Sequence, residues 1–147
     1  MKNSSGRYSG FTLIEMLVVL VIIGLLAGLV GPRLFGHVDS SKVKTADVQI
    51  KMLKGAVETF RLDEGRFPTQ AEGLLVLTQS PADERSRSNW RGPYLDQDVP
   101  LDPWGNAYIY SLPGANGQPF ALYSLGADGK RGGEGIDADI GMLPPVQ

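Results

Sequence analysis

The most regular pattern in the sequence is an unbroken run of apolar and small residues from Phe11 to Gly31, in which only Thr12 and Glu15 are polar. As a helix, this run would span about 30 Å at ~1.5 Å per residue, which matches the hydrocarbon core of a bilayer. Because the run is apolar on every side, it does not fit the buried helix of a small soluble domain, which keeps one polar face.

Two membrane interpretations of this run compete. A secretory signal peptide would have a shorter apolar core and a small-x-small cleavage site, of which residues 27–30 offer only a poor version. A retained membrane anchor, with a processing site between Gly10 and Phe11, fits better. Lys2 and Arg7 precede the run, so we expect the N-terminus to stay cytoplasmic and the rest of the chain to face outward.

Glu15 is the one charged residue inside the apolar run. A carboxylate in a membrane helix costs roughly 3 kcal/mol on insertion scales, which favours a functional role with a positive partner. Cleavage after Gly10 would give Phe11 a free α-amine that could pair with Glu15 of the same chain or of a neighbouring copy. Two simpler explanations are a glutamate that reaches the membrane interface and one that is protonated in the lipid.

The sequence Gly-Phe-Thr-Leu-Ile-Glu at residues 10–15, followed by the apolar run, resembles the class III signal of type IV pilins and pseudopilins. This resemblance implies that residues 1–10 are a leader. A prepilin peptidase would cut between Gly10 and Phe11 and N-methylate Phe11. It also implies a membrane and filament-core helix over residues 11–35, in which Gly24 and Pro32 bound a stretch that loses helicity in assembled filaments.

Beyond the run, apolar residues at steps of three and four predict that the helix continues to about Asp63. Gly65 and Pro68 should end this helix. The apolar stripe would pack on the domain's own sheet. The charged residues beside it are most simply a solvated face, although some of them could contact other subunits. The stripe comprises Val43, Ala46, Ile50, Leu53, Val57 and Phe60.

The remaining elements are short. Thr69 and Glu72 have capping-box spacing, which predicts a helix over about 70–79 that buries Leu74, Leu75 and Leu77. Residues 80–98 look irregular. Two segments rich in β-branched and aromatic residues predict antiparallel strands at 107–111 and 120–124. The expected fold class is α+β: a long N-terminal α-helix packed on a small antiparallel β-sheet, with a loop-rich, metal-binding C-terminus.

Composition limits the possible functions of the chain. Its 147 residues suffice for the anchor and one globular domain over residues 36–147. Removing Lys2 and Arg7 from the 14 basic residues leaves 12 against 16 acidic ones, a net charge of −4, so no nucleic acid is expected as a partner. There is no cysteine, so no disulfide can staple the domain.

A glycine-rich segment near the C-terminus carries four carboxylates, Asp128, Glu134, Asp137 and Asp139. Ca²⁺ takes six to eight oxygen ligands, and a tight glycine-rich loop can offer both carboxylates and backbone carbonyls. A bound Ca²⁺ could therefore close this segment in place of a disulfide. From spacing alone, a flexible acidic tail explains the pattern slightly better than a metal site does.

Several further motifs occur in one order along the chain and resemble the major pseudopilin family of the bacterial type II secretion system. That resemblance implies a Ca²⁺ site formed by the Leu125 carbonyl and by the side chains of Asp128 and Asp139. Members carry another carboxylate just before the last one; here that position is Ala138, so Asp137 would have to serve. The motifs are Phe67-Pro68-Thr69, Gly73-Leu74, Asp102 to Asn106, Tyr123 to Gly129 and Ala138 to Gly141.

The resemblance implies a non-enzymatic filament subunit, anchored in the bacterial inner membrane with its domain in the periplasm. Subunits would polymerise into a pseudopilus that drives folded proteins across the outer membrane, with minor pseudopilins and an inner-membrane assembly platform as partners. A membrane-tethered enzyme is disfavoured, because no nucleophile–base pair is identifiable. An adhesive or motile pilin is disfavoured because those usually close their C-terminal region with a disulfide.

Overall fold

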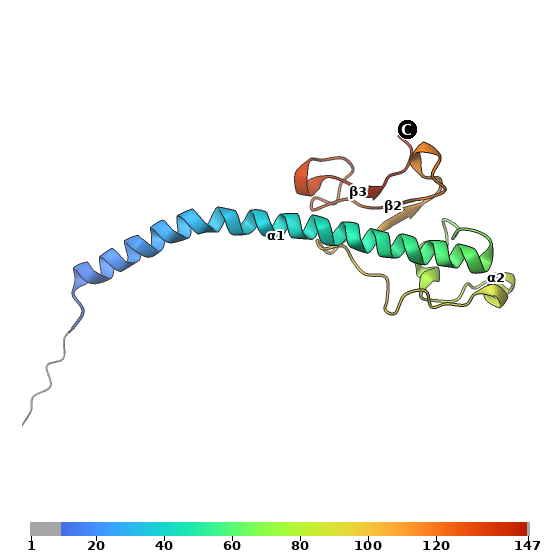
Figure 1. The fold of residues 1–147 in the computed structure, drawn as a ribbon, viewed down its shortest axis with the longest axis horizontal. Helices are drawn as coiled ribbons and strands as arrows, with labels where there is room; N and C mark the ends of the chain where they lie inside the picture. Colours follow the sequence, from blue (N-terminus) through green and yellow to red (C-terminus); the bar gives the residue numbers. More distant parts are fainter. Residues whose placement is uncertain (1–9, 147) are drawn as a thin grey trace, which may run out of the picture. The chain divides into compact units, whose positions relative to one another are not determined.

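The computed structural model describes residues 10–146, except for the side chains of residues 31–38. The chain divides into two compact units between Val38 and Asp39. One α-helix, α1 (Leu13–Glu64), contributes to both of them and is continuous over its 52 residues (Figure 1). Of the predicted leader, only Gly10 lies among the described residues.

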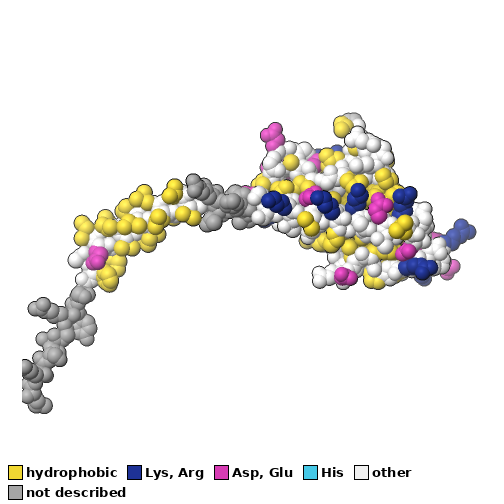
Figure 2. Space-filling view, viewed as in Figure 1, with side chains coloured by type: hydrophobic (Ala, Val, Ile, Leu, Met, Phe, Trp, Pro, Cys, Tyr) yellow, Lys and Arg dark blue, Asp and Glu magenta, His cyan; other side chains and the backbone are white. Residues whose placement is uncertain are grey.

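The N-terminal unit is the apolar half of α1. Its segment Leu13–Val30 has a mean hydropathy of 2.9, is long enough to cross a membrane and has none of its residues buried within the chain. Figure 2 shows apolar side chains over the visible surface of this segment, whereas charged side chains of both signs follow the second half of α1. The first half therefore has no apolar partner within its own described chain.

The C-terminal unit is built on the second half of α1. Five of the six residues in the predicted stripe are buried, from Ala46 to Phe60, and the helix ends one residue later than predicted, at Glu64. Gly65 follows with a φ of +71°, and its N–H donates to the Arg61 carbonyl at 2.8 Å. The core also includes Leu74, Val76, Leu77, Tyr108, Tyr110, Phe120 and Leu122.

Three short antiparallel strands form one sheet in the order β1-β2-β3. They are β1 (Ile109–Ser111), β2 (Ala121–Ser124) and β3 (Ile140–Met142), with 3₁₀ turns η2 (Ala115–Gly117) and η3 (Gly135–Asp137) in the two connections. A Cβ built on Gly141 of β3 would lie 3.0 Å from the Ile50 Cδ1 atom, so the sheet packs directly on α1. The α+β fold of a helix on a small antiparallel sheet is thus confirmed, and β3 is an addition that the sequence did not predict.

The capping box forms, but the α-helix expected over 70–79 does not. The Glu72 N–H donates to Thr69 Oγ1 at 3.3 Å, and the Thr69 N–H donates to Glu72 Oε2 at 2.8 Å. Gly73 then takes a φ of +54°, which a right-handed helix does not allow, and only the 3₁₀ turn η1 (Leu75–Leu77) follows. As a result Leu75 is exposed, contrary to expectation, and Val76 is buried in its place.

The prediction that residues 80–98 are irregular was wrong in part. They contain a short helix, α2 (Glu84–Asn89), whose N-cap Asp83 accepts a hydrogen bond from the Ser86 N–H at 3.1 Å. After α2, the indole N–H of Trp90 donates to the Val76 carbonyl at 2.9 Å, and Tyr94 packs edge-on against Phe60 at 5.7 Å between ring centroids. These contacts fix the segment to the end of α1.

Candidate functional site

The predicted processing site lies just ahead of α1. Gly10, Phe11 and Thr12 precede the first helical residue, Leu13, and the Phe11 side chain is 75% exposed. The Glu15 N–H donates to Thr12 Oγ1 at 3.3 Å, so Thr12 caps the start of the helix. The bond between Gly10 and Phe11 therefore lies in exposed, non-helical residues ahead of α1.

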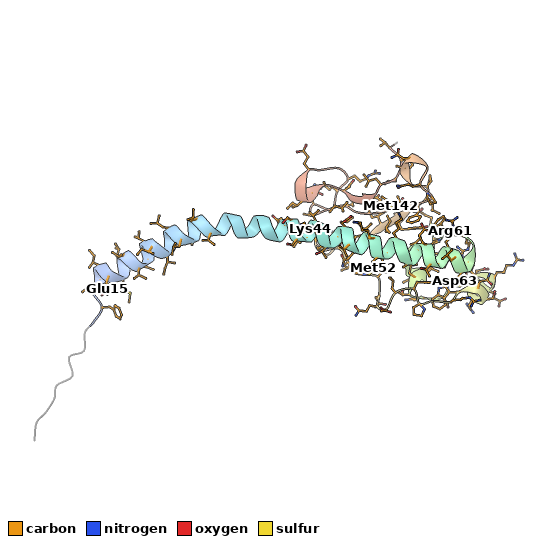
Figure 3. The ribbon with its side chains drawn as sticks, viewed as in Figure 1. Glu15, Lys44, Met52, Arg61, Asp63 and Met142 are labelled. Carbon is orange, nitrogen blue, oxygen red and sulfur yellow. The ribbon has the colours of Figure 1, made fainter. Side chains whose placement is uncertain are left out.

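Glu15 lies in the first turn of α1, beside the non-helical residues (Figure 3). A negative side chain at this position complements the partial positive charge of a helix N-terminus. None of the salt bridges found among residues 10–146 includes Glu15. Within the described residues, its carboxylate therefore forms no ion pair.

Gly24 and Pro32, predicted to bound a segment that unwinds in filaments, both lie inside the continuous helix. A Cβ built on Gly24 would meet nothing within 4 Å, so no close neighbour in this chain requires a glycine there. Unwinding concerns assembled subunits, and it stays a prediction.

The predicted metal loop connects β2 to β3 and is anchored on a buried carboxylate, Asp102. Asp102 Oδ1 accepts hydrogen bonds from the backbone N–H groups of Trp104, at 3.0 Å, and Asn106, at 2.8 Å. Asp102 Oδ2 accepts a 2.6 Å hydrogen bond from the Ser124 hydroxyl, whose oxygen accepts the Gly126 N–H at 3.1 Å. The buried network therefore fixes the first residues of the loop.

The loop then closes on itself through its backbone. The Ala127 N–H donates to the Ile136 carbonyl at 2.9 Å. Gly126 has a φ of +69°, and a Cβ there would lie only 2.7 Å from the Ile136 carbonyl oxygen and 2.8 Å from that of Ala138. Only glycine fits this approach, which holds the segment around Leu125 beside residues 136–138.

Only some of the carboxylate oxygens in the loop accept hydrogen bonds. Asp128 Oδ1 accepts the Lys130 N–H at 2.9 Å, and Asp139 Oδ2 accepts the Gly132 N–H at 3.1 Å. Asp139 Oδ1 is buried and has no hydrogen-bond partner. Asp137 donates its N–H to the Glu134 carbonyl at 3.1 Å. Within the described residues, no three His, Cys, Asp or Glu side chains are grouped closely enough to hold a metal ion, so a metal-binding C-terminus is not shown.

A second polar cluster, which the sequence analysis missed, lies at the other end of the domain. Arg66 binds both carboxylate oxygens of Glu72, at 2.7 and 2.8 Å, and donates to Ser86 Oγ at 2.8 Å. We call Glu64, Arg66, Glu72 and Ser86 the Arg66 cluster. Hydrogen bonding to Arg66 lowers the pKa of Glu72 to about 2, whereas burial raises the pKa of Glu64. Glu64, Arg66 and Glu72 lie within nine positions, but Ser86 comes from α2, so no linear motif indicates the whole cluster.

Comparison with known proteins gives consistent matches over both units. A family model described as type II secretion system, protein G matches residues 33–143, and one described as the prokaryotic N-terminal methylation motif matches residues 5–31. The chain is 47% identical over 135 residues to type II secretion system core protein G of Pseudomonas aeruginosa, covering 92% of this chain and 94% of that protein. The Vibrio cholerae protein of the same name is 41% identical over 135 residues, with 92% and 91% covered.

A solved structure agrees with these sequence matches. The crystal structure of the major pseudopilin from the type 2 secretion system of enterohaemorrhagic Escherichia coli superposes with a TM-score of 0.61 and 31% sequence identity. The match covers 75% of this chain and 93% of that one. The fold and the sequence therefore point to the same family.

Proposed function

Because this chain belongs to the type II secretion system protein G family and is a structural subunit of the pseudopilus, we propose that Glu15 and the amine of Phe11 set the register of its polymer. The observation that carries the function is the family match over residues 33–143 together with the methylation motif over residues 5–31. This family is structural and is not known as an enzyme.

The methylation motif implies processing by a prepilin peptidase and assembly into a pseudopilus. In our proposal, the peptidase cuts between Gly10 and Phe11 and methylates the new Phe11 amine. The exposed, non-helical backbone at these residues supports this assignment.

The apolar helix and the family suggest membrane anchoring and periplasmic exposure of the domain. We propose a single pass in the inner membrane with the N-terminus cytoplasmic. Minor pseudopilins and an inner-membrane platform would be the partners of the growing filament, and Gly24 and Pro32 would bound a stretch of α1 that unwinds as subunits join it. The filament would then drive folded proteins across the outer membrane.

The axial register of neighbouring subunits would be set by the pairing of opposite charges in a medium of low dielectric constant. An ionised Glu15 that has no partner in lipid is costly, and the amine of an adjacent subunit removes that cost only at one axial stagger. Glu15→Ala should therefore abolish filament assembly while membrane insertion persists, measured by electron microscopy of sheared filaments and by membrane fractionation. Glu58→Ala, which removes a partly exposed acid in the other half of α1, is the matched control. Normal filaments from the Glu15 variant would refute the pairing.

We further propose that the loop between β2 and β3 binds Ca²⁺. The ligands would be the Leu125 carbonyl and the side chains of Asp128, Asp137 and Asp139. The buried oxygen of Asp139 that has no hydrogen-bond partner supports this, as does the backbone closure that brings residues 125–127 beside residues 136–138. When bound, the ion would supply oxygen-ligand bonds that tie the two sides of the loop together.

The calcium proposal is tested by the thermal unfolding of the full chain in detergent, with Ca²⁺ or with a chelator. A ligand that binds only the folded state raises the midpoint in a concentration-dependent way. Asp128→Ala and Asp139→Ala should remove this shift, whereas Glu134→Ala, in the same loop, should keep it. A midpoint that is equal with Ca²⁺ and with chelator would refute the site and leave the family assignment intact.

A further inference from the structure

One oxygen of the Glu64 carboxyl group lacks the partner that a buried charge needs. Its side chain is 2% exposed, and its Oε1 atom is buried with no hydrogen-bond partner. It is also the last residue of α1, where the partial negative charge of a helix C-terminus disfavours a second negative charge. Nothing in the calcium loop or at the start of α1 accounts for this group.

The nearest cation, Arg66, donates its hydrogen bonds to other groups. Its Nε atom lies 3.9 Å from Glu64 Oε2, beyond hydrogen-bond distance. The terminal nitrogens donate to Glu72, to Ser86 and, at 3.2 Å, to the Phe67 carbonyl. Glu64 thus receives the weaker, non-hydrogen-bonded share of a single positive charge.

The other groups around Glu64 add negative charge. Asp63 of α1 accepts a 2.9 Å hydrogen bond from the Tyr94 hydroxyl, and Glu72 belongs to the capping turn. Asp83 caps α2, the helix that supplies Ser86. Arg66 is the only cation among these groups. A metal ion at the orphan oxygen would be repelled by the nearby guanidinium, so the cation that fits this position is a proton.

We propose that Glu64 carries a proton in the folded domain and that this proton makes the Arg66 cluster a pH-sensitive clamp on the end of α1. The cluster joins three elements: the last turn of α1, the capping turn at Thr69–Glu72, and α2 through Ser86. Protonated Glu64 leaves one carboxylate, Glu72, to pair with Arg66. Loss of the proton adds a second, buried negative charge and weakens the attachment of α2.

Burial is the largest influence on the pKa of Glu64 and raises it in the folded state, while Arg66 and a hydrogen bond with Ser86 act in the opposite direction. A group whose pKa is higher in the folded state stabilises the fold fully at low pH, and this stabilisation is lost as the pH rises through the folded-state pKa. Acidification should therefore tighten the clamp only down to about pH 4.5, the ordinary pKa of a glutamate, because below that pH the stabilisation from Glu72 begins to be lost.

The test is denaturant unfolding of the full chain in detergent micelles between pH 4.5 and 8, for the wild type and for Glu64→Gln. The glutamine side chain has nearly the same shape as protonated glutamate but cannot ionise. As the pH rises through the pKa of Glu64, the unfolding constant of the wild type should increase relative to that of Glu64→Gln, by up to tenfold per pH unit. The single histidine is present in both proteins, so its titration cancels in this ratio.

Glu58→Gln is the matched control, because Glu58 is a partly exposed glutamate of the same helix and should leave the pH dependence unchanged. In addition, ¹³C NMR of the labelled side-chain carboxyl groups should show Glu64 titrating above 4.5, the ordinary pKa of a glutamate. The proposal is overturned if Glu64→Gln keeps the wild-type pH dependence, or if Glu64 titrates at or below that value.

Discussion

The two halves of α1 are both rich in apolar residues, yet they relate to the rest of the chain in opposite ways. Every residue of Leu13–Val30 is exposed, whereas Leu53, Val57 and Phe60 in the second half have no exposed surface. The visible surface of the first half is largely apolar, whereas charged side chains of both signs lie along the visible surface of the second half (Figure 2). A helix with one apolar stripe finds its partner within the domain, while a helix that is apolar all round needs lipid or other helices.

The largest effect is expected when one leucine side chain is shortened to alanine in each half of α1. Leu53→Ala removes a fully buried side chain from the core and should cost about 2–5 kcal/mol of unfolding free energy. Leu25→Ala removes a 70% exposed side chain and should leave the unfolding of the domain unchanged. Denaturant titration of the full chain in micelles measures both, and equal losses would contradict the division.

Burial should also determine how much a carboxylate contributes to the stability of the domain. Asp102→Ala leaves the N–H groups of Trp104 and Asn106 and the Ser124 hydroxyl without their acceptor, so we expect a loss of about 2–4 kcal/mol. Asp98→Ala, at an exposed position, should change stability by less than about 0.5 kcal/mol. Thermal unfolding compares the two variants, and a mild Asp102 variant would show that water replaces the lost acceptor.

Acid should act on the domain through Glu72. Its pKa falls from 4.5 to about 2 on folding, so its stabilisation is fully present above pH 4.5 and is lost as the pH falls towards 2. The shift corresponds to up to about 3 kcal/mol. Glu72→Gln should lower stability at pH 7 and flatten the acid limb of a stability–pH curve recorded by circular dichroism. An unchanged acid limb would assign acid sensitivity to other carboxylates.

The smallest effect is expected on the charged face of α1. Lys51 and Asp47 form a 2.7 Å ion pair, but their side chains are 71% and 48% exposed. Solvent and salt screen such a pair, so Lys51→Ala should change the unfolding free energy by less than about 0.5 kcal/mol. A double-mutant cycle with Asp47→Ala isolates the pair energy, and a value above about 1 kcal/mol would show that this face is not simply solvated.

Sequence reasoning succeeded where a pattern is local. The stripe from Ala46 to Phe60, the end of α1 and the pairing of β1 with β2 follow from periodicity, from Gly65 and from a short connection. The N-terminal signal and the family motifs were equally explicit, and the comparisons bear out the family they indicated.

Prediction from the sequence failed where tertiary contacts determine the local structure. The positive φ of Gly73 overrode the capping box at Thr69–Glu72, and Gly141 lets β3 lie close to both Leu122 of β2 and Ile50 of α1. The Arg66 cluster joins residues up to 22 positions apart, from Glu64 to Ser86, so its geometry has no signature in the linear sequence. The role of Asp137, by contrast, stays a prediction.

The positions of the two tryptophans have an optical consequence. Trp90 packs against Tyr94 beside the Arg66 cluster. Trp104 lies in the turn whose Asp102 also accepts a hydrogen bond from Ser124, at the start of the loop between β2 and β3. The chain has no other tryptophan, so its tryptophan fluorescence, excited selectively near the red edge of the absorption band, comes from one residue at each polar site. Trp104→Phe would leave emission that follows the proton-dependent end of α1, and Trp90→Phe would leave emission that follows the loop.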